Sequence, residues 1–271
     1  MRHDTQAREL SEHPIAARWE TLRAEGRAAF VPYLTAGYPT PAQAVDALHM
    51  LEGAGADLVE VGVPFSDPLA DGVTIQRSSQ AALEQGVTAA RVLEQIDRAS
   101  VGIPVVIMTY LNPVLAYGVE RFVKDAAAAG ASGLLLTDLP AGADPSVEAE
   151  VGRSALALIR LVAPTTNGAR LAAALGGARG FVYFISRLGV TGVRDSVPAD
   201  LEAQIARIRA ATALPVAVGF GIATPAQART AARTADGVVV GSALVEALGR
   251  GLGAAEALAR ELVRAVRDAR R

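Results

Sequence analysis

The sequence predicts an α/β protein built as a single closed (β/α)8 barrel. Its 271 residues, 51% of them hydrophobic, match the roughly 250 residues of one such barrel. Short apolar runs alternate eight times with Ala-rich segments of helical pattern, which is typical of repeated βα units. The runs are continuous in Val, Ile and Leu, as in parallel strands covered on both faces. An open doubly wound sheet, built from the same units, is the alternative fold.

Eight strands and eight helical segments are expected in alternation. The strands cover Phe30–Thr35, Asp57–Gly62, Val105–Tyr110, Gly133–Asp138, Leu156–Val162, Gly180–Ser186, Pro215–Gly219 and Asp236–Gly241. The helical segments cover Pro41–Gly53, Thr74–Ser100, Val119–Ala129, Pro145–Gly152, Ala169–Leu175, Pro198–Ala211, Pro225–Thr234 and Ala243–Arg271. Proline in the first turn marks several of the helix starts.

One domain is expected over residues 1–271, because the sequence has no linker, low-complexity tract or change of composition. Residues 1–27 form an N-terminal helical extension, in which Ile15–Leu22 has the pattern of a short amphipathic helix. These residues mix acids and bases and lack the apolar core of a secretory signal.

Composition excludes several classes of function. A net charge of −2 gives no reason to expect nucleic acid or an anionic membrane as a partner. The absence of cysteine excludes disulfides and thiolate chemistry and suits a reducing compartment, so a cytoplasmic location is expected. No apolar run approaches the roughly 20 residues that span a bilayer.

The most informative segment is LVEVGVPFSDPLADG over residues 58–72. It places Glu60 inside an apolar strand and Asp71 in the polar loop that follows. Burial raises the pKa of a carboxyl group toward neutral pH, whereas a better solvated carboxylate stays ionised. The pair could therefore divide acid–base catalysis and charge stabilisation between them. Taken singly, Glu60 could be a strand-end acid satisfied by backbone donors, and Asp71 could be an ordinary Asp-Gly turn.

Two glycine-containing turns follow the last two strands. Gly219-Phe220-Gly221 ends the seventh strand, and Gly241-Ser242 ends the eighth. Barrel enzymes frequently bind phosphate between these two loops, where backbone N–H groups and a helix N-terminus supply donors. The alternative is that the glycines only make tight turns.

A third loop and four aromatic residues add candidates for substrate binding. Residues 186–192, which include Thr191, follow the sixth strand and suit a loop that closes over substrate; an ordinary surface loop is the alternative. Tyr33, Tyr110, Tyr183 and Phe220 lie on or directly after predicted strands. Such rings either fill the core or line a pocket for a flat apolar substrate.

Absences narrow the chemistry further. All three histidines precede the second strand, and the one lysine, Lys124, lies in a predicted helix. No metal-binding cluster is predicted, and an imine-forming lysine inside the barrel is not expected. A magnesium ion held by carboxylates and substrate phosphate stays an alternative. Carboxylate acid–base chemistry on a phosphate-anchored substrate is the favoured interpretation.

These motifs closely resemble the tryptophan synthase alpha subunit family, a family of TIM barrels. The segment EVGVPFSDPLADG at 60–72, continuing to TIQ at 74–76, is highly specific for it. Further matches occur in family order, namely FVPYLTAG at 30–37, YLNP at 110–113, DLP at 138–140, APTT at 163–166, residues 186–192, GFG at 219–221 and GS at 241–242. They span nearly the whole chain.

The resemblance implies retro-aldol cleavage of indole-3-glycerol phosphate to indole and glyceraldehyde 3-phosphate. It implies that Glu60 is the general acid/base, that Asp71 stabilises positive charge at the indole nitrogen, and that Tyr183 lies near the reacting carbons. The implied residues of the indole pocket are Tyr33, Tyr110, Leu135 and Phe220. The implied residues of the phosphate site and its neighbours are Thr191, Gly192, Gly221, Gly241 and Ser242.

The resemblance also implies a partner. The family works with a beta subunit that carries pyridoxal phosphate, in an α2β2 heterotetramer, and the alpha chain itself needs no cofactor or metal. The loops holding Asp67 and Arg187 resemble the ones that communicate with that partner. Three residues are departures: Val73 stands where the family usually has Pro, and Thr137 where Pro or Ala is more usual. Tyr33 stands where several members have Phe, and it adds a hydroxyl that needs a partner.

Two other functions share part of this pattern. A different phosphosugar enzyme, such as an isomerase of an aminated ribose phosphate, would share the late glycines but does not need the loop that ends at Asp71. A barrel kept mainly as an allosteric binding subunit would need no acid pair, and both acids are present.

Overall fold

Eight parallel strands close into a barrel in a computed structural model, which describes residues 13–166, 168–185, 200–219 and 221–269. The strands are β1 (Ala29–Thr35), β2 (Val59–Gly62), β3 (Val105–Thr109), β4 (Ala131–Leu136), β5 (Ala157–Val162), β6 (Val182–Ile185), β7 (Val216–Gly219) and β8 (Gly237–Val240). Each pairs with its neighbour in sequence, and β1 also pairs with β8. The predicted barrel is therefore confirmed, and the open sheet is excluded.

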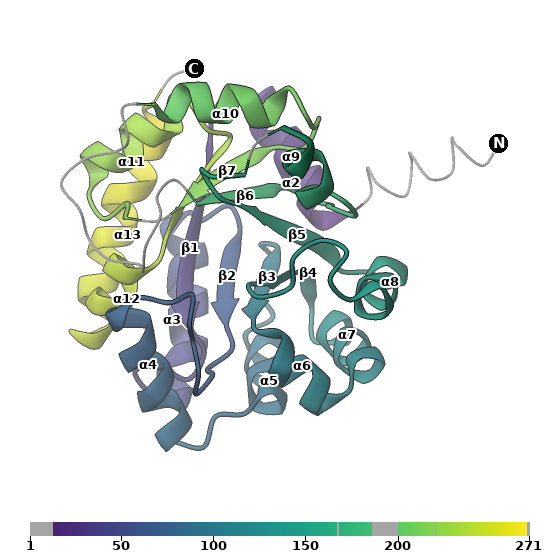
Figure 1. Cartoon of the computed structure of the whole chain (residues 1–271). Helices are drawn as coiled ribbons and strands as arrows, with labels where there is room; N and C mark the ends of the chain where they lie inside the picture. Colours follow the sequence, from purple (N-terminus) through teal and green to yellow (C-terminus); the bar gives the residue numbers. More distant parts are fainter. Residues whose placement is uncertain (1–12, 167, 186–199, 220, 270–271) are drawn as a thin grey trace.

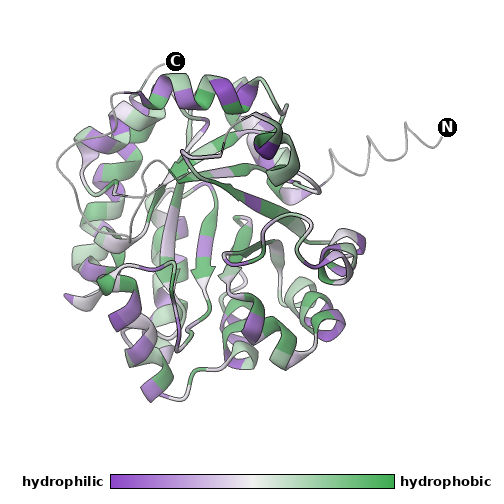
Figure 2. Cartoon of the chain, in the orientation of Figure 1, coloured by the Kyte–Doolittle hydropathy of each residue, from purple (hydrophilic) through white to green (hydrophobic). Residues whose placement is uncertain are grey.

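Helices surround the barrel, as Figure 1 shows. They are α2 (Pro14–Ala24), α3 (Pro41–Ala54), α4 (Val73–Glu84), α5 (Ala89–Ala99), α6 (Leu111–Tyr117), α7 (Val119–Ala128), α8 (Pro145–Arg153), α9 (Gly168–Ala174), α10 (Leu201–Arg209), α11 (Pro225–Ala232), α12 (Ser242–Gly249) and α13 (Leu252–Arg267). Figure 2 shows that the strands are hydrophobic along most of their length, whereas the helices also carry hydrophilic residues. One apolar cluster fills the layer between strands and helices, and another fills the barrel interior.

Two predicted helical segments are each divided in the structure. The segment 74–100 forms α4 and α5, because the chain turns at Gly86, whose φ is +73°, and restarts where the Thr88 side chain accepts a hydrogen bond from Arg91 N–H. Only glycine adopts such a φ readily. The segment 243–271 likewise divides into α12 and α13 at residues 250–251. Helix α6, directly after β3, was not predicted.

Helix α2 closes the amino-terminal end of the barrel. Ile15, Trp19 and Leu22 are buried in the same cluster as inward-facing strand residues, and the Trp19 ring lies 5.7 Å from that of Phe181. The functional end is therefore the opposite one, where the strands end and the βα loops begin.

His13 caps this helix in its neutral form, so we expect the cap to weaken in acid. Its Nδ1 accepts a hydrogen bond from Ile15 N–H at 3.3 Å, and its Nε2 lies 3.0 Å from the Ala155 carbonyl oxygen. Burial lowers the pKa of His13, and a positive charge at a helix N-terminus is unfavourable. The unfolded chain therefore takes up the proton first as pH falls below about 6.5, which costs stability.

The measurement compares His13→Asn, which keeps a capping oxygen but does not titrate, with the wild type in urea unfolding at pH 7 and pH 5. The wild type should lose up to about 1 kcal/mol more on acidification than the variant. Parallel losses in the two proteins would contradict the prediction.

Candidate active site

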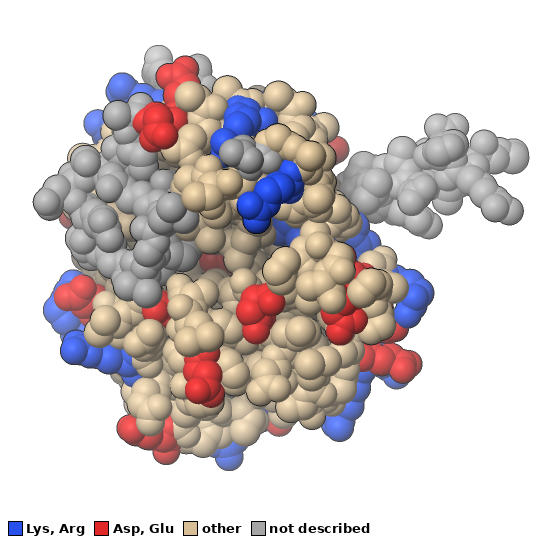
Figure 3. All heavy atoms as spheres, in the orientation of Figure 1, with Lys and Arg blue, Asp and Glu red and all other residues tan. Residues whose placement is uncertain are grey.

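A pocket opens at the carboxyl-terminal end of the barrel, where Figure 3 shows the face hollowed near its centre. The lining residues come from five strands, β1, β2, β3, β6 and β8, and from the loops and helix starts that follow β2, β7 and β8. They are Tyr33, Glu60, Asp71, Ile75, Met108, Tyr183, Gly221, Ile222, Ala223, Val239, Gly241, Ser242 and Ala243. Apolar walls with a few converging polar groups are typical of a site for a small, largely apolar ligand.

Glu60 provides a buried carboxyl group whose polar atoms face this pocket. It lies on β2 in register with Tyr33 of β1 and Val106 of β3, and its side chain is fully buried. Neither of its carboxyl oxygens has a hydrogen-bond partner within the part of the chain that the structure describes. Burial raises the pKa of Glu60 to about 8, so the group is mostly protonated at neutral pH.

Asp71 is held in place by its neighbours in the loop between β2 and α4. Its backbone N–H donates to the Pro68 carbonyl oxygen at 3.0 Å, and Gln76 Nε2 donates to the Asp71 carbonyl oxygen at 2.9 Å. Its Oδ2 accepts a hydrogen bond from the Tyr110 hydroxyl at 2.9 Å. Burial raises the pKa of Asp71 to about 6, and the Tyr110 hydrogen bond opposes this rise. At neutral pH Asp71 is therefore mostly ionised while Glu60 is mostly neutral.

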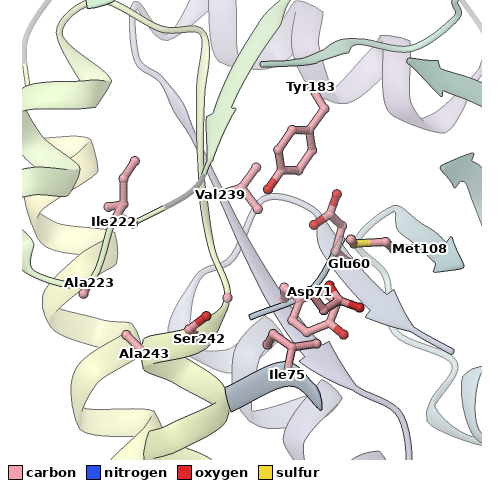
Figure 4. A pocket seen from close by; sticks show the side chains of 13 residues that line it. Glu60, Asp71, Ile75, Met108, Tyr183, Ile222, Ala223, Val239, Ser242 and Ala243 are labelled. Carbon is pink, nitrogen blue, oxygen red and sulfur yellow. The ribbon is translucent and has the colours of Figure 1, made fainter. Parts of the chain in front are cut away.

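Two tyrosines share the pocket with the acids. Figure 4 shows the Tyr183 hydroxyl pointing toward the Glu60 carboxyl group. Burial, and then the charge of Glu60, raise the pKa of Tyr183 well above its ordinary value, so it stays protonated. Both rings need glycine beside them, because a Cβ at Gly219 would lie 2.2 Å from the Tyr183 oxygen and one at Gly62 would lie 2.1 Å from the Tyr33 oxygen.

Two residues expected in the indole pocket, Leu135 and Tyr110, are not among the lining residues of this pocket. Leu135 is fully buried in the apolar cluster of the barrel interior, which also contains the pocket residues Tyr183 and Val239. Tyr110 contacts the loop between β2 and α4: its hydroxyl donates to Asp71, and its ring centroid is 5.1 Å from that of Phe65. Tyr110 therefore positions an acid of the pocket.

The glycine turns after β7 and β8 reach the same pocket. Gly221, Gly241 and Ser242 line it, and Ser242 begins α12. The first N–H groups of a helix have no partner within the helix, so this end could bind an anion. Thr191, Gly192, Phe220 and Arg187 lie outside the described residues.

Several lining residues were not predicted. Ile75 lies in the TIQ motif at 74–76, four residues after Asp71, and strand alternation places Met108 on the same face of β3 as the inward-facing Val106. Among the residues that the structure describes, no cluster of three or more His, Asp or Glu side chains could hold a metal ion. No helix in the described ranges is long and apolar enough to cross a membrane.

Comparison with known proteins gives the site its context. A family model described as "Tryptophan synthase alpha chain" matches residues 19–270. The chain belongs to the tryptophan synthase alpha chain family. The alpha chain from Gluconacetobacter diazotrophicus is 48% identical over 86% of each chain, and that from Acidiphilium cryptum is 46% identical over 94% of this chain and 93% of the relative.

Solved structures agree with this assignment. Tryptophan synthase of Mycobacterium tuberculosis matches with a TM-score of 0.87 at 43% identity, covering 93% of this chain and 98% of that one. The tryptophan synthase alpha subunit of Legionella pneumophila matches with a TM-score of 0.85 at 34% identity, covering 94% and 98%.

Membership of the tryptophan synthase alpha family confirms the predicted reaction class. Alpha chains are lyases that cleave indole-3-glycerol phosphate to indole and glyceraldehyde 3-phosphate in tryptophan biosynthesis. They need no cofactor of their own, because pyridoxal phosphate belongs to the beta subunit with which the family pairs. The lyase is thereby favoured over the phosphosugar isomerase.

Proposed function

We propose that this chain cleaves indole-3-glycerol phosphate with Glu60 as proton donor and acceptor, Asp71 as the stabiliser of charge on the indole ring, and Tyr183 beside the reacting carbons. The observation that carries the proposal is the pair of acids on one apolar pocket, with the pKa of Glu60 near 8 and that of Asp71 near 6. Two carboxyl groups whose pKa values are pushed apart are suited to different roles.

The reaction needs a place for the electrons of the breaking carbon–carbon bond. Neutral Glu60 gives its proton to C3 of the indole ring, which becomes an iminium-like ring with positive charge at nitrogen. Asp71 accepts the ring N–H and binds more strongly as that charge develops, which is the differential stabilisation that catalysis requires.

Ionised Glu60 then removes the proton of the glycerol hydroxyl beside the ring. The hydroxyl carbon becomes the aldehyde of glyceraldehyde 3-phosphate, and the electrons of the broken bond restore indole. Glu60 has regained its proton, so acid and base balance over one cycle. The Tyr183 hydroxyl, aimed at Glu60 in Figure 4, can hold the reacting hydroxyl in line.

The phosphate end of the substrate fits the turns after β7 and β8. Gly221, Gly241 and Ser242 line the same pocket as the two acids, and Ser242 begins a helix. Backbone N–H groups at such a terminus bind phosphate without any charged side chain. By resemblance, Thr191 and Gly192 complete this site, and Phe220 completes the indole pocket. Fixing both ends of the substrate can itself lower a barrier by several kcal/mol.

We also propose that this chain assembles with a tryptophan synthase beta subunit as α2β2 in the cytoplasm. Large apolar side chains are exposed on segments that follow β2 and β3, namely Leu69 at 89%, Val73 at 54% and Leu115 at 48%. An exposed apolar group of this kind supports a protein interface. The test is release of free indole from indole-3-glycerol phosphate, measured with and without a purified beta subunit. A chain that releases no indole in either case would overturn the proposed function.

The pH dependence of kcat/KM for indole-3-glycerol phosphate should be bell-shaped. Activity should rise with pH through about 6, as Asp71 becomes ionised, and fall above about 8, as Glu60 loses the proton that it must donate. The measurement is the initial rate at low substrate concentration from pH 5 to pH 9.5. A flat profile over this range would contradict the assignment of the two acids.

Asp71→Asn should lower kcat/KM by roughly 10²- to 10³-fold, because the amide cannot neutralise the charge that develops on the ring. It should also abolish the acidic limb of the pH profile. The matched control is Tyr110→Phe, which leaves the charge but removes the hydrogen bond to Oδ2. Since that bond lowers the pKa of Asp71, its loss should move the acidic limb to higher pH. An unchanged rate in Asp71→Asn would remove this residue from the mechanism.

A further inference from the structure

The tyrosines at the mouth of the barrel differ in how their hydroxyl groups are used. The Tyr110 hydroxyl donates to Asp71 Oδ2 at 2.9 Å and accepts from Ala70 N–H at 3.0 Å, so it acts both as a donor and as an acceptor. The Tyr183 hydroxyl points toward the Glu60 carboxyl group in Figure 4. Tyr33 lies 3.3 Å from Thr35 Oγ1, its nearest hydrogen-bonding partner in those ranges. The Tyr33 hydroxyl thus has a partner within the barrel.

The direction of this hydrogen bond follows from the atoms beyond it. Ser78 Oγ lies 2.8 Å from the Ile75 carbonyl oxygen, which can only accept, so the single hydroxyl hydrogen of Ser78 is used there. Thr35 Oγ1, 2.7 Å from Ser78 Oγ, must then donate to Ser78. Tyr33 in turn donates to Thr35, and this is the arrangement that satisfies all three contacts.

The hydroxyl chain leaves the Tyr33 oxygen with an open acceptor position. Burial, and then the charge of Asp71, raise the pKa of Tyr33 well above its ordinary value, so the phenol keeps the proton that it gives to Thr35. The ring packs with Ile75 and Met108 on the wall of the pocket. A phenol oxygen whose hydrogen points away from a pocket can accept, but cannot donate, a hydrogen bond there.

We propose that Tyr33 is a specificity determinant that favours indole rings carrying a hydrogen-bond donor, a hydroxyl or amino group, on the benzo ring. The proposal rests on the proposed function, because it places the indole ring in this pocket. A buried acceptor favours a substituent that donates to it and disfavours one that presents a lone pair. A phenylalanine at this position would make no such distinction.

The test uses the reverse reaction, in which glyceraldehyde 3-phosphate condenses with added indoles. Hydroxyindoles and fluoroindoles substituted at positions 4 to 7 are compared at each position, because fluorine is of similar size but cannot donate. We measure the ratio of kcat/KM for the hydroxy compound to that for the fluoro compound. At one position or more, this ratio should be about 5- to 10-fold higher in the wild type than in Tyr33→Phe, the effect of one neutral hydrogen bond.

A second variant tests the direction of the hydrogen bonds from Tyr33 through Thr35 to Ser78. Thr35→Val keeps the side-chain shape but removes the acceptor, so the Tyr33 proton becomes available to the pocket. The rate with azaindoles, whose ring nitrogen presents a lone pair, should then rise about 5-fold relative to indole, whereas Tyr33→Phe should show no such rise.

Failure of the proposed function and failure of the role of Tyr33 give different results. If the wild type does not condense indole itself with glyceraldehyde 3-phosphate, the proposed function is wrong. If it does, but the hydroxy-to-fluoro ratio is the same in wild type and Tyr33→Phe at all four positions, only the role assigned to Tyr33 is overturned. An unchanged azaindole preference in Thr35→Val would mean that Tyr33 does not donate to Thr35. The Tyr33 oxygen would then not be the acceptor that the proposal requires.

Discussion

Glu60→Gln is expected to lower the turnover of indole-3-glycerol phosphate by roughly 10³-fold or more, because the amide can neither give a proton to the ring nor remove one from the glycerol hydroxyl. Glutamine has nearly the same shape, so binding of a phosphate ligand should be largely retained. The measurement is single-turnover release of indole, together with the Kd of a substrate analogue. A matched control is Glu256→Gln on the surface of α13, where the carboxylate contacts only Arg260 within the described residues.

A measurement of stability distinguishes a loss of catalysis in Glu60→Gln from a loss of folding. The pKa of Glu60 is raised in the folded state to about 8, so its contribution to stability is fully present below the unfolded value of about 4.5 and is lost as pH rises through about 8. An uncharged glutamine carries no such penalty. Glu60→Gln should therefore be at least as stable as the wild type at pH 8 to 9 in thermal unfolding. Near-normal turnover in a folded variant would exclude Glu60 as the acid/base.

The barrel and its acid pair could be predicted because both depend on local patterns. Eight apolar runs separated by helical segments predict a parallel sheet, and an acid inside one of those runs is conspicuous at Glu60. The loop position of Asp71 is likewise set by the Pro, Ser and Gly residues around it. These features need no knowledge of which elements pack together.

The parts that were missed depend on packing. In a sheet covered on both faces the strands are continuously apolar, so the sequence does not separate Leu135, which is fully buried, from Met108, which lines the pocket. The register pairs these two residues across β3 and β4. The partner of the Tyr33 hydroxyl depends on how α4 sets Ser78 against β1.

Asp57 was expected only as the first residue of a strand, but in the structure it joins three segments at the amino-terminal end of the barrel. Its carboxylate is bonded to Arg18 of α2, and it accepts hydrogen bonds from Arg27 Nη1 and Nη2 at 2.9 and 3.0 Å and from Phe30 N–H at 2.9 Å. The side chain is only 1% exposed. Its importance was not apparent from the sequence because all its partners lie 27 to 39 residues away.

Asp57→Ala is therefore expected to lower the free energy of unfolding by about 3–5 kcal/mol, because it leaves two arginines and a buried backbone N–H without their shared acceptor. The measurement is urea unfolding followed by the fluorescence of Trp19, the one tryptophan of the chain. Trp19 lies on the helix that Arg18 ties to Asp57, so the probe reports on the segment that the substitution releases.

The matched control is Glu25→Gln, which removes the other carboxylate of the same arginine. Glu25 accepts a hydrogen bond from Arg27 Nε at 2.5 Å, but its side chain is 47% exposed. An ion pair in that setting contributes about 1 kcal/mol or less, because water and salt screen it. The two variants thus separate the effect of burial from the effect of charge. A similar shift of the unfolding midpoint in both would mean that Asp57 contributes no more than an ordinary surface ion pair. Helix α2 would then be held against the barrel by Ile15, Trp19 and Leu22 alone.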